Sequence, residues 1–448
     1  MNRVFIRTYG CQMNERDSEA VACKLQARGY EIVNREEIAD VVLLNTCSVR
    51  EQAERKAIGK AHQLANRKKK DQKFIFGIMG CMAQNRGEEL LDILPDIDLV
   101  VGTQKFHRVP EHLDFLNQTD QPASQNVVDL NEEESSQNEI REHFDTGKNK
   151  VTAFVSIMQG CNMRCSFCIV PKTRGKERYR SIESIVEEVE QLVEKGVSEV
   201  TLLGQIVNAY GRGSIPRING KSPFVQLLEK INSIDGLSRI RFTSPHPTSF
   251  GDDLIECYAS LSKVCEYAHL PMQSGSDRIL KLMRRRYNIE KYLNLVERIR
   301  DVRPSMSFSS DFIVGFPGET DVDFQKTMEL INEVKFDESF SFIYSPRPNT
   351  TASDMADDVT KDEKKKRLNI LQDRLNQLSF GFSRKKVGSI QNCLVYGQSK
   401  RDPGQLQGRT ICNRIVNFPS NDIDLVGRLI NINIKEALPN CLRGNIHN

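Results

Sequence analysis

The sequence predicts an α/β protein built from an N-terminal open parallel sheet, a central partial (β/α)6 barrel and a small C-terminal all-β barrel. Three observations lead to this fold class. Strand and helix patterns alternate up to about residue 125, and the alternation returns from Val151 for six further units. Beyond residue 379, short strands follow one another with little helical period. Alternating strands and helices are typical of parallel sheets, and successive short strands are typical of small barrels.

The first part shows three β-branched or aromatic runs, VFIRTYG (4–10), DVVLLNT (40–46) and KFIFGIMG (73–80), which predict buried strands. Helices are predicted over 14–28, closed by Gly29, and over 50–70. The acidic stretch DLNEEESSQNEIREHFD (129–145) is typical of a linker. We therefore expect an N-terminal domain over 1–125 and a linker over 126–150.

The second part, expected over 151–378, contains six candidate barrel strands separated by amphipathic helices. In the first of these helices, Ser184 and Glu187 match a capping box and Gly196 marks the end. Six such units predict a barrel that stops short of eight. The predicted strands span 153–160, 199–205, 239–245, 267–273, 307–316 and 339–345.

The third part, expected over 379–448, follows a charged helix at about 361–387. Gly, Pro and Asn turns separate its strands, which favours a barrel that closes its own edges. Residues 384–443 contain ten Lys and Arg against four Asp and Glu, although the whole chain carries a net charge of only +3. This local excess favours nucleic acid as a partner, and a solvated basic surface is the alternative.

Composition narrows the function class. No stretch approaches the length of an apolar membrane span, and the N-terminus lacks the apolar core of a signal peptide, so we expect a cytoplasmic protein without a membrane partner. In a reducing compartment, twelve cysteines point to metal binding or catalysis rather than to disulfides.

The strongest motif is a C-x3-C-x2-C array formed by Cys161, Cys165 and Cys168 after the first barrel strand. Thiolates select zinc, copper or iron–sulfur clusters, and structural zinc requires four ligands. A [4Fe-4S] cluster held by three cysteines keeps one iron open to a ligand. The alternatives are zinc or three free core cysteines.

A second cysteine set is scattered in the sequence: Cys11, Cys47 and Cys81 each directly follow a predicted strand. Because the carboxyl ends of parallel strands border one crevice, these thiols could hold a second three-cysteine cluster. Three independently buried cysteines are the alternative.

The array with Phe167 before its last cysteine resembles the signature of the radical S-adenosylmethionine (SAM) superfamily. This resemblance implies a [4Fe-4S] cluster whose open iron binds SAM, and cleavage of SAM to a 5′-deoxyadenosyl radical. It also implies a SAM pocket at the carboxyl ends of the barrel strands; ordinary loop chemistry is the alternative for each pocket residue. The expected pocket residues are Phe167, Gly204, Gln205, Gln273, Ser274 and Gly315.

Further segments resemble the methylthiotransferase family: YGCQMN (9–14), NTCSVRE (45–51) and GIMGCMAQ (77–84), with GRT (408–410), Asn413 and LRG (442–444) similar to a TRAM domain. Four segments resemble the branch that acts on N6-isopentenyladenosine at position 37 of tRNA: GCQMN (10–14), NTCSVRE (45–51), TSPHP (243–247) and HLPMQSGSDRILKLMRRRY (269–287). The resemblance implies two [4Fe-4S] clusters, one SAM as methyl donor and another as radical source. Methylthiolation of a ribosomal-protein aspartate or of threonylcarbamoyladenosine 37 is the alternative within the family. An RNA-binding iron–sulfur electron carrier is the alternative outside it.

The expected partners are the anticodon stem-loop of tRNA, an electron donor such as flavodoxin or ferredoxin, and a sulfur donor; we expect a monomer. Lys172, Arg174 and Arg178 follow the cysteine array, and together with Arg409 they are the candidate RNA contacts. The sequence departs from the branch pattern at four positions outside the cysteine sets, which affects fine positioning rather than reaction class. These positions are Gln159, Ile206, Asn349 and Tyr396.

Overall fold

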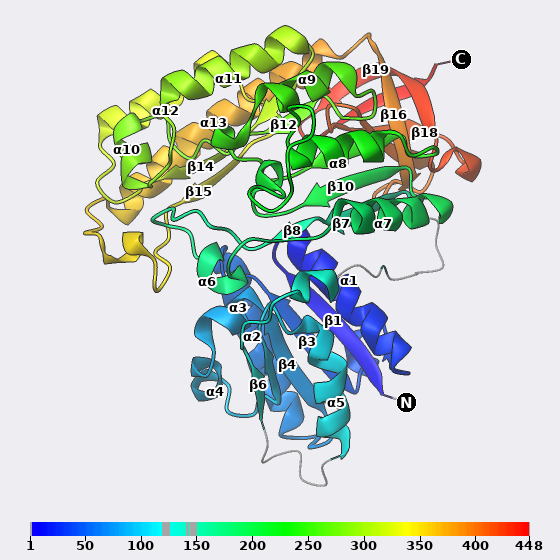
Figure 1. Cartoon of the computed structure of the whole chain (residues 1–448), viewed down its shortest axis with the longest axis vertical. Helices are drawn as coiled ribbons and strands as arrows, with labels where there is room; N and C mark the ends of the chain where they lie inside the picture. The colour runs from blue at the N-terminus through cyan, green and yellow to red at the C-terminus, as the bar shows by residue number, and fades with distance from the viewer. Residues whose placement is uncertain (1, 119–125, 140–142, 144–149, 448) are drawn as a thin grey trace.

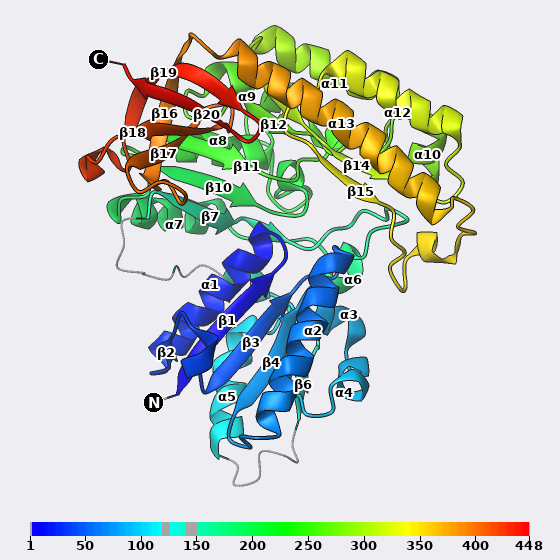
Figure 2. The ribbon, with the colours of Figure 1, turned by 180° about the vertical axis from the view of Figure 1, so that it is seen from behind.

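The computed structural model describes residues 2–118, 126–139, 143 and 150–447. Figures 1 and 2 show the N-terminal sheet domain lying against one end of the barrel domain, with the C-terminal strands packed on the barrel's far side. The predicted fold class is confirmed in all three parts.

The N-terminal domain is a six-stranded sheet in the order β2-β1-β3-β4-β5-β6, and all of its pairs are parallel. Its central strands β3 and β4 are buried at every position, as expected for a sheet covered by helices on both faces. The strands are β1 (Arg3–Tyr9), β2 (Glu31–Ile32), β3 (Val41–Thr46), β4 (Ile75–Gly80), β5 (Leu99–Val101) and β6 (Val127–Asp129). The helices are α1 (Gln12–Ala27), α2 (Glu51–Lys68), α3 (Cys81–Arg86), α4 (Glu89–Ile93) and α5 (Val109–Gln118), with short 3-10 turns at η1 (Glu36–Ile38), η2 (Phe106–Arg108) and η4 (Ser136–Glu139).

The predicted linker is corrected at its start. Strand β6 falls inside the range 126–150 and pairs with β5, so the N-terminal sheet extends to Asp129. A strand of three residues is too short to show a hydrophobic periodicity, and the acidic residues that follow it made the whole segment resemble a linker. The remainder of the predicted linker includes residues 140–142 and 144–149, which lie outside the described residues.

The barrel domain contains parallel pairs from six strand positions, although its hydrogen-bonded ladders are interrupted. β11-β10-β7, β12-β13 and β14-β15 form separate ladders, with single bridges at Ile240–Val264 and Gln273–Phe312 between them. The strands are β7 (Thr152–Ser156), β8 (Met158–Gln159), β9 (Arg178–Tyr179), β10 (Glu199–Leu203), β11 (Arg239–Phe242), β12 (Tyr267–His269), β13 (Ser307–Ser309), β14 (Asp311–Val314) and β15 (Phe340–Ile343). The helices are α6 (Val170–Arg174), α7 (Ile182–Glu194), α8 (Pro223–Asn232), α9 (Asp252–Ser260), α10 (Asp277–Leu282), α11 (Ile289–Val302), α12 (Asp321–Val334) and α13 (Lys361–Lys385), with 3-10 turns η5 (Val207–Ala209), η6 (Pro247–Ser249) and η7 (Thr351–Asp354).

Two local predictions in the barrel are corrected. Helix α7 begins one turn before the predicted capping box, because the Ser181 hydroxyl accepts the Ser184 backbone N–H and is the N-cap. The predicted strand 307–316 divides at Ser310 into β13 and β14, which pair with different neighbours.

The C-terminal part is a closed barrel in the order β16-β17-β18-β20-β19. It packs against β10 and β11 through buried polar groups. Tyr396 Oη donates to Glu199 Oε1 over 2.7 Å, and the guanidinium of Arg239 donates to the carbonyl of Arg409 over 2.7 Å. The strands are β16 (Ile390–Gln398), β17 (Gln405–Thr410), β18 (Ile415–Pro419), β19 (Leu429–Leu438) and β20 (Cys441–Ile446), with the 3-10 turn η8 (Ile423–Leu425).

Candidate functional site

A cavity of about 310 Å³ lies between the N-terminal sheet and the barrel, and all six cysteines of the two predicted sets line it. The fold therefore brings together residues that are up to 157 positions apart in the sequence. The other six cysteines do not line this cavity. The cysteines in its wall are Cys11, Cys47, Cys81, Cys161, Cys165 and Cys168.

The first triad, Cys11, Cys47 and Cys81, stands at the carboxyl ends of β1, β3 and β4, which are adjacent in the sheet. Burial raises the pKa of the Cys81 thiol to about 11, and the neighbouring Cys47 and Cys11 thiolates act in the same direction. Burial and the Cys11 thiolate also raise the pKa of Cys47. The backbone N–H of Val49 donates to Cys47 Sγ over 3.3 Å. Cys11 and Cys47 therefore lie close enough to Cys81 for their charge to act on its thiol, as ligands of one group must.

The second triad occupies the loop between β8 and α6. The Met163 backbone N–H donates to Cys161 Sγ over 3.4 Å, and Arg285 Nη1 donates to Cys165 Sγ over 3.5 Å. Burial raises the pKa of Cys161 to about 11 and that of Cys168 to about 12, with the Cys165 thiolate adding to both shifts. Iron binding would displace these protons, because only the thiolate is a ligand.

The donor chemistry of both triads fits an iron–sulfur cluster, because such clusters are held by cysteine thiolates. A cluster with several irons spreads its thiolates around a core and tolerates N–H donors on its sulfurs. The all-sulfur donor sets and the N–H groups at Cys47, Cys161 and Cys165 meet those requirements.

Four of the six residues predicted for SAM line the same cavity: Phe167, Gly204, Gln205 and Gln273. The side-chain oxygen Oε1 of Gln205 is buried and has no hydrogen-bond partner among the described residues, so it is available to a ligand. At Gly204, a Cβ would meet Met158 Cγ at 2.5 Å, which explains the glycine beside the cavity wall.

Ser274 and Gly315, the other two predicted SAM residues, do not line the cavity. Ser274 is fully buried, and its hydroxyl accepts the backbone N–H of Ser276 over 3.3 Å. Gly315 has φ +67° and packs against the side chain of Lys364, while its N–H donates to Glu319 Oε2 over 2.7 Å.

The four predicted RNA residues have different surroundings. Lys172 is exposed on α6, and Arg178 is half-buried, with a 3.5 Å hydrogen bond to Gln159 Oε1. Arg409 on β17 is half-buried, and its Nη1 donates to Asn413 Oδ1 over 3.0 Å. Arg174 is corrected: it is 3% exposed, lines the cavity and pairs with Asp17, so it cannot reach a phosphate backbone.

Several cavity residues carried no usable signal in the sequence. Arg285 belongs to a basic run that is typical of a solvated helix, yet it lines the cavity and donates to Cys165. His246 also lines the cavity, and its pKa falls to about 3 because of burial and the nearby Arg285. Asp311, at the start of β14, completes this side of the wall. Of the three, only His246 follows a predicted barrel strand, which is where such barrels gather their active sites.

The four departures from the branch pattern are accommodated locally. Asn349 has φ 68°, a conformation that asparagine adopts more readily than most residues other than glycine. Tyr396 forms the interdomain hydrogen bond to Glu199 described above. Gln159 is buried beside Arg178, and Ile206 lines the cavity as an apolar residue.

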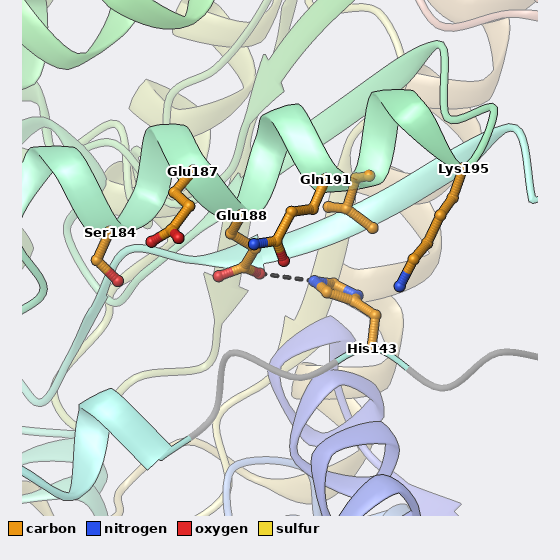
Figure 3. A pocket seen from close by; sticks show the side chains of 7 residues that line it. His143, Ser184, Glu187, Glu188, Gln191 and Lys195 are labelled. Atoms are coloured by element: carbon orange, nitrogen blue, oxygen red, sulfur yellow. Dashed lines mark hydrogen bonds and ion pairs between the residues drawn. The ribbon is translucent and has the colours of Figure 1, made fainter.

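A separate cavity of about 450 Å³ follows one face of α7 and contains no cysteine. In Figure 3, His143 points toward Glu188 on α7, and the dashed line marks the 2.6 Å hydrogen bond between them. The charged residues that line this cavity belong to an ion-pair network between domains rather than to the cysteine site. The lining residues are His143, Ser184, Glu187, Glu188, Gln191, Leu192 and Lys195.

Comparison with known families agrees with the three-part fold. The profile of the Radical SAM superfamily matches residues 155–331, that of the uncharacterized protein family UPF0004 matches 3–102, and that of the TRAM domain matches 384–446. Among solved structures, the radical SAM methyltransferase TsrM from Kitasatospora setae aligns with a TM-score of 0.58 at 13% identity, covering 79% of this chain and 75% of that one. The cobalamin-dependent SAM radical enzyme OxsB aligns with a TM-score of 0.51 at 10% identity, covering 84% of this chain and 56% of that one. These likenesses concern the fold.

Sequence relatives are much closer. A tRNA-2-methylthio-N(6)-dimethylallyladenosine synthase from Opitutus terrae is 51% identical, with 100% of this chain and 98% of the relative covered. A protein of the same name from Methylacidiphilum infernorum is 50% identical, with 94% and 90% covered. With such identity along its whole length, the chain belongs to the tRNA-2-methylthio-N(6)-dimethylallyladenosine synthase family of radical SAM enzymes.

Proposed function

We propose that the protein methylthiolates C2 of N6-isopentenyladenosine at position 37 of tRNA, using one SAM as methyl donor and another as radical source. The observation that carries the proposal is that two cysteine triads line one cavity. A sulfur source and a radical source must both reach a single carbon, and a shared cavity permits this. The names of the full-length relatives specify the same nucleoside.

The cofactors are [4Fe-4S] clusters and SAM. We assign one cluster to Cys161, Cys165 and Cys168, and an auxiliary cluster to Cys11, Cys47 and Cys81. When bound, these groups supply the electron, the adenosyl radical and the transferable sulfur.

The remaining cavity residues bind and orient. Gln205 offers its unpartnered Oε1 to a polar group of SAM, and Gly204 and Phe167 shape the wall beside it. Arg285 donates to Cys165 Sγ and, through Nη2, to the carbonyl of Pro271 over 3.0 Å, which fixes the guanidinium beside the thiolate. The enclosing domains exclude water from the reacting carbon, as radical chemistry requires.

The tRNA substrate must present adenosine 37 out of its stack to reach this cavity. We assign backbone-phosphate contacts to Lys172, Arg178 and Arg409, since phosphate contacts require charge rather than sequence readout. The residues in the described part of the chain include no helix both long and apolar enough to cross a bilayer. We place the enzyme in the cytoplasm as a monomer, served by a flavodoxin- or ferredoxin-type reductant and a separate sulfur donor.

The test is nucleoside mass spectrometry of tRNA from a strain lacking the gene. We expect methylthio-isopentenyladenosine to disappear, isopentenyladenosine to accumulate, and both to revert on complementation. Unchanged methylthio-isopentenyladenosine would contradict the proposal. Loss of the mass increment on a ribosomal protein, or of methylthiolated threonylcarbamoyladenosine, would assign the enzyme to another branch of the family.

A further inference from the structure

Arg174 is the last residue of α6, six positions beyond Cys168, but its side chain reaches across the domain boundary into the N-terminal sheet domain. Only 3% of the residue is exposed. Its Nη2 donates to Oδ2 of Asp17, a fully buried carboxylate on α1, over 2.6 Å. Because α1 begins directly after Cys11, the helix that carries the partner of Arg174 also positions a member of the auxiliary triad.

The other terminal nitrogen of Arg174, Nη1, is buried and has no hydrogen-bond partner among the described residues. A buried guanidinium N–H without an acceptor is costly, so it calls for a partner such as a ligand, an ion or an ordered water molecule. Arg174 lines the cavity together with Cys11, Cys47 and Cys81. An acceptor in that cavity would supply the missing partner.

The electrostatics of the site favour an anionic acceptor. Burial opposes the charge of Arg174, but the adjacent Asp17 carboxylate raises its pKa, so the guanidinium remains charged. Asp17 offsets part of this charge on the Nη2 side. Three thiolates at the triad would repel an added anion, and a fixed cation in the same wall offsets that repulsion.

We propose that Arg174 binds, through Nη1–H, an anionic sulfur ligand held at the Cys11, Cys47 and Cys81 site. The ligand class is sulfide or methanethiolate, because a soft sulfur anion suits the iron of a cluster held by three thiolates, whereas a hard oxyanion does not. The inference rests on the proposed function, because it assigns Arg174 to the sulfur that is transferred. Asp17 is then a positioning residue that holds the guanidinium in place.

The experiment uses full-length protein with both clusters reconstituted anaerobically, and the probe is sodium methanethiolate with a deuterated methyl group. After incubation and desalting, the probe is released with acid and quantified by mass spectrometry, and iron is measured on the same sample. Wild-type protein should retain the probe, and Arg174→Gln should bind it about tenfold more weakly with unchanged iron. Arg174→Lys, which keeps the charge, should recover most of the affinity.

Lys176→Gln is the matched control, because Lys176 is exposed on the same segment and does not line the cavity. Wild-type affinity in an Arg174→Gln protein with full iron would overturn the inference. If Arg174→Gln loses iron, Arg174→Lys and Asp17→Asn are compared instead. Normal probe affinity in both variants at full iron would overturn the inference. Weakened affinity in Asp17→Asn, with affinity recovered in Arg174→Lys, would support it.

The electron paramagnetic resonance spectrum of the auxiliary cluster gives a second readout, since the probe should change it in wild-type protein and, in Arg174→Gln, only at about tenfold higher probe concentration. Failure of this inference is distinguishable from failure of the proposed function. If tRNA is methylthiolated normally but probe binding does not depend on Arg174, only the inference is wrong. If probe binding depends on Arg174 but the protein leaves tRNA unmodified, only the proposed function is wrong.

Discussion

Burial alone does not separate the six cavity cysteines from the other six. Cys257, Cys265 and Cys393 are as buried as Cys47 and Cys81, and burial raises the pKa values of their thiols as well. What differs is the position in the chain, because each member of the N-terminal triad directly follows a strand and meets its partners at one sheet edge. Topology therefore identified this site where composition could not.

We predict that Cys47→Ala removes about half of the bound iron and leaves SAM cleavage measurable, because only the auxiliary cluster loses a ligand. Iron analysis and 5′-deoxyadenosine formation with dithionite measure the two effects. Cys441→Ala, in the C-terminal barrel, is the control and should retain all of the iron. Full iron in Cys47→Ala would remove Cys47 from the ligand set.

His246 predicts a pH dependence of stability. Its folded-state pKa of about 3 lies below the value of 6.5 expected when unfolded, because burial and Arg285 disfavour the cation. As pH falls below about 6.5, the unfolded state takes up a proton that the folded state refuses, so stability decreases by about 1.4 kcal/mol per pH unit until the folded pKa is reached. His246→Asn, which preserves an acceptor for the Thr248 N–H, should flatten this decline in urea unfolding of the apoprotein between pH 6.5 and 5. Parallel declines in both proteins would contradict the assignment.

At the scale of elements, strand β15 presents two exposed phenylalanines. Phe340 is 54% exposed and Phe342 is 38% exposed. Phe340 pairs with Asp311, which lines the cavity, and its ring centroid lies 6.2 Å from that of His269. An exposed aromatic surface next to the cavity suits stacking with an unpaired base.

We therefore predict that Phe340→Ala weakens binding of an anticodon stem-loop carrying N6-isopentenyladenosine by about tenfold, because stacking contributes about 1–3 kcal/mol per base. Fluorescence anisotropy measures the affinity, and SAM cleavage without RNA should not change. Phe115→Ala, at an exposed phenylalanine on α5 in the N-terminal domain, is the control. Equal affinities for all three proteins would exclude Phe340 from the RNA interface.

Elements were predictable where their signal is local. The strands before Cys11, Cys47 and Cys81 were found because their apolar runs are continuous, and α1 and α2 deviate by only one or two residues from the predicted bounds. Strand β6 and the break between β13 and β14 were missed, because pairing with distant strands decides them. The start of α7 was misplaced because Ser181 and Ser184 are equally plausible caps by sequence.

At the scale of the whole molecule, sequence reasoning fails mainly for charged residues, which it places on the surface. Arg414 was counted in the basic surface of the C-terminal domain, but it is 5% exposed and pairs with Asp337 of the barrel domain. Arg239 and Arg241 on β11 are likewise buried, and they donate to backbone carbonyls of the C-terminal barrel. Charge at these positions holds domains together, and only the three-dimensional arrangement reveals it.

Buried charges also join the N-terminal domain to the barrel, and the carboxylate of Glu188 lies at the centre of this group. Its carboxylate lies 2.5 Å from Arg180 Nη1, 2.6 Å from His143 Nε2 and 3.7 Å from Nη2 of Arg16 on α1. Arg16 and Arg180 are fully buried. Removal of the buried anion from its ion pair with the buried Arg180 costs about 3–5 kcal/mol.

We predict that Glu188→Gln destabilises the protein by about that amount and uncouples the unfolding of the N-terminal domain from that of the barrel, because the variant leaves Arg16 and Arg180 without this carboxylate. Calorimetry should resolve two separate unfolding transitions in Glu188→Gln, whereas the two transitions of wild-type protein should overlap more. Glu187→Gln, one residue earlier on α7 and exposed, should change stability by less than about 0.5 kcal/mol. A Glu188→Gln protein that unfolds like the Glu187→Gln control would show that the two domains are held together by other contacts. Because the two triads share a cavity only while these domains remain docked, Glu188→Gln should also lower tRNA methylthiolation more than SAM cleavage.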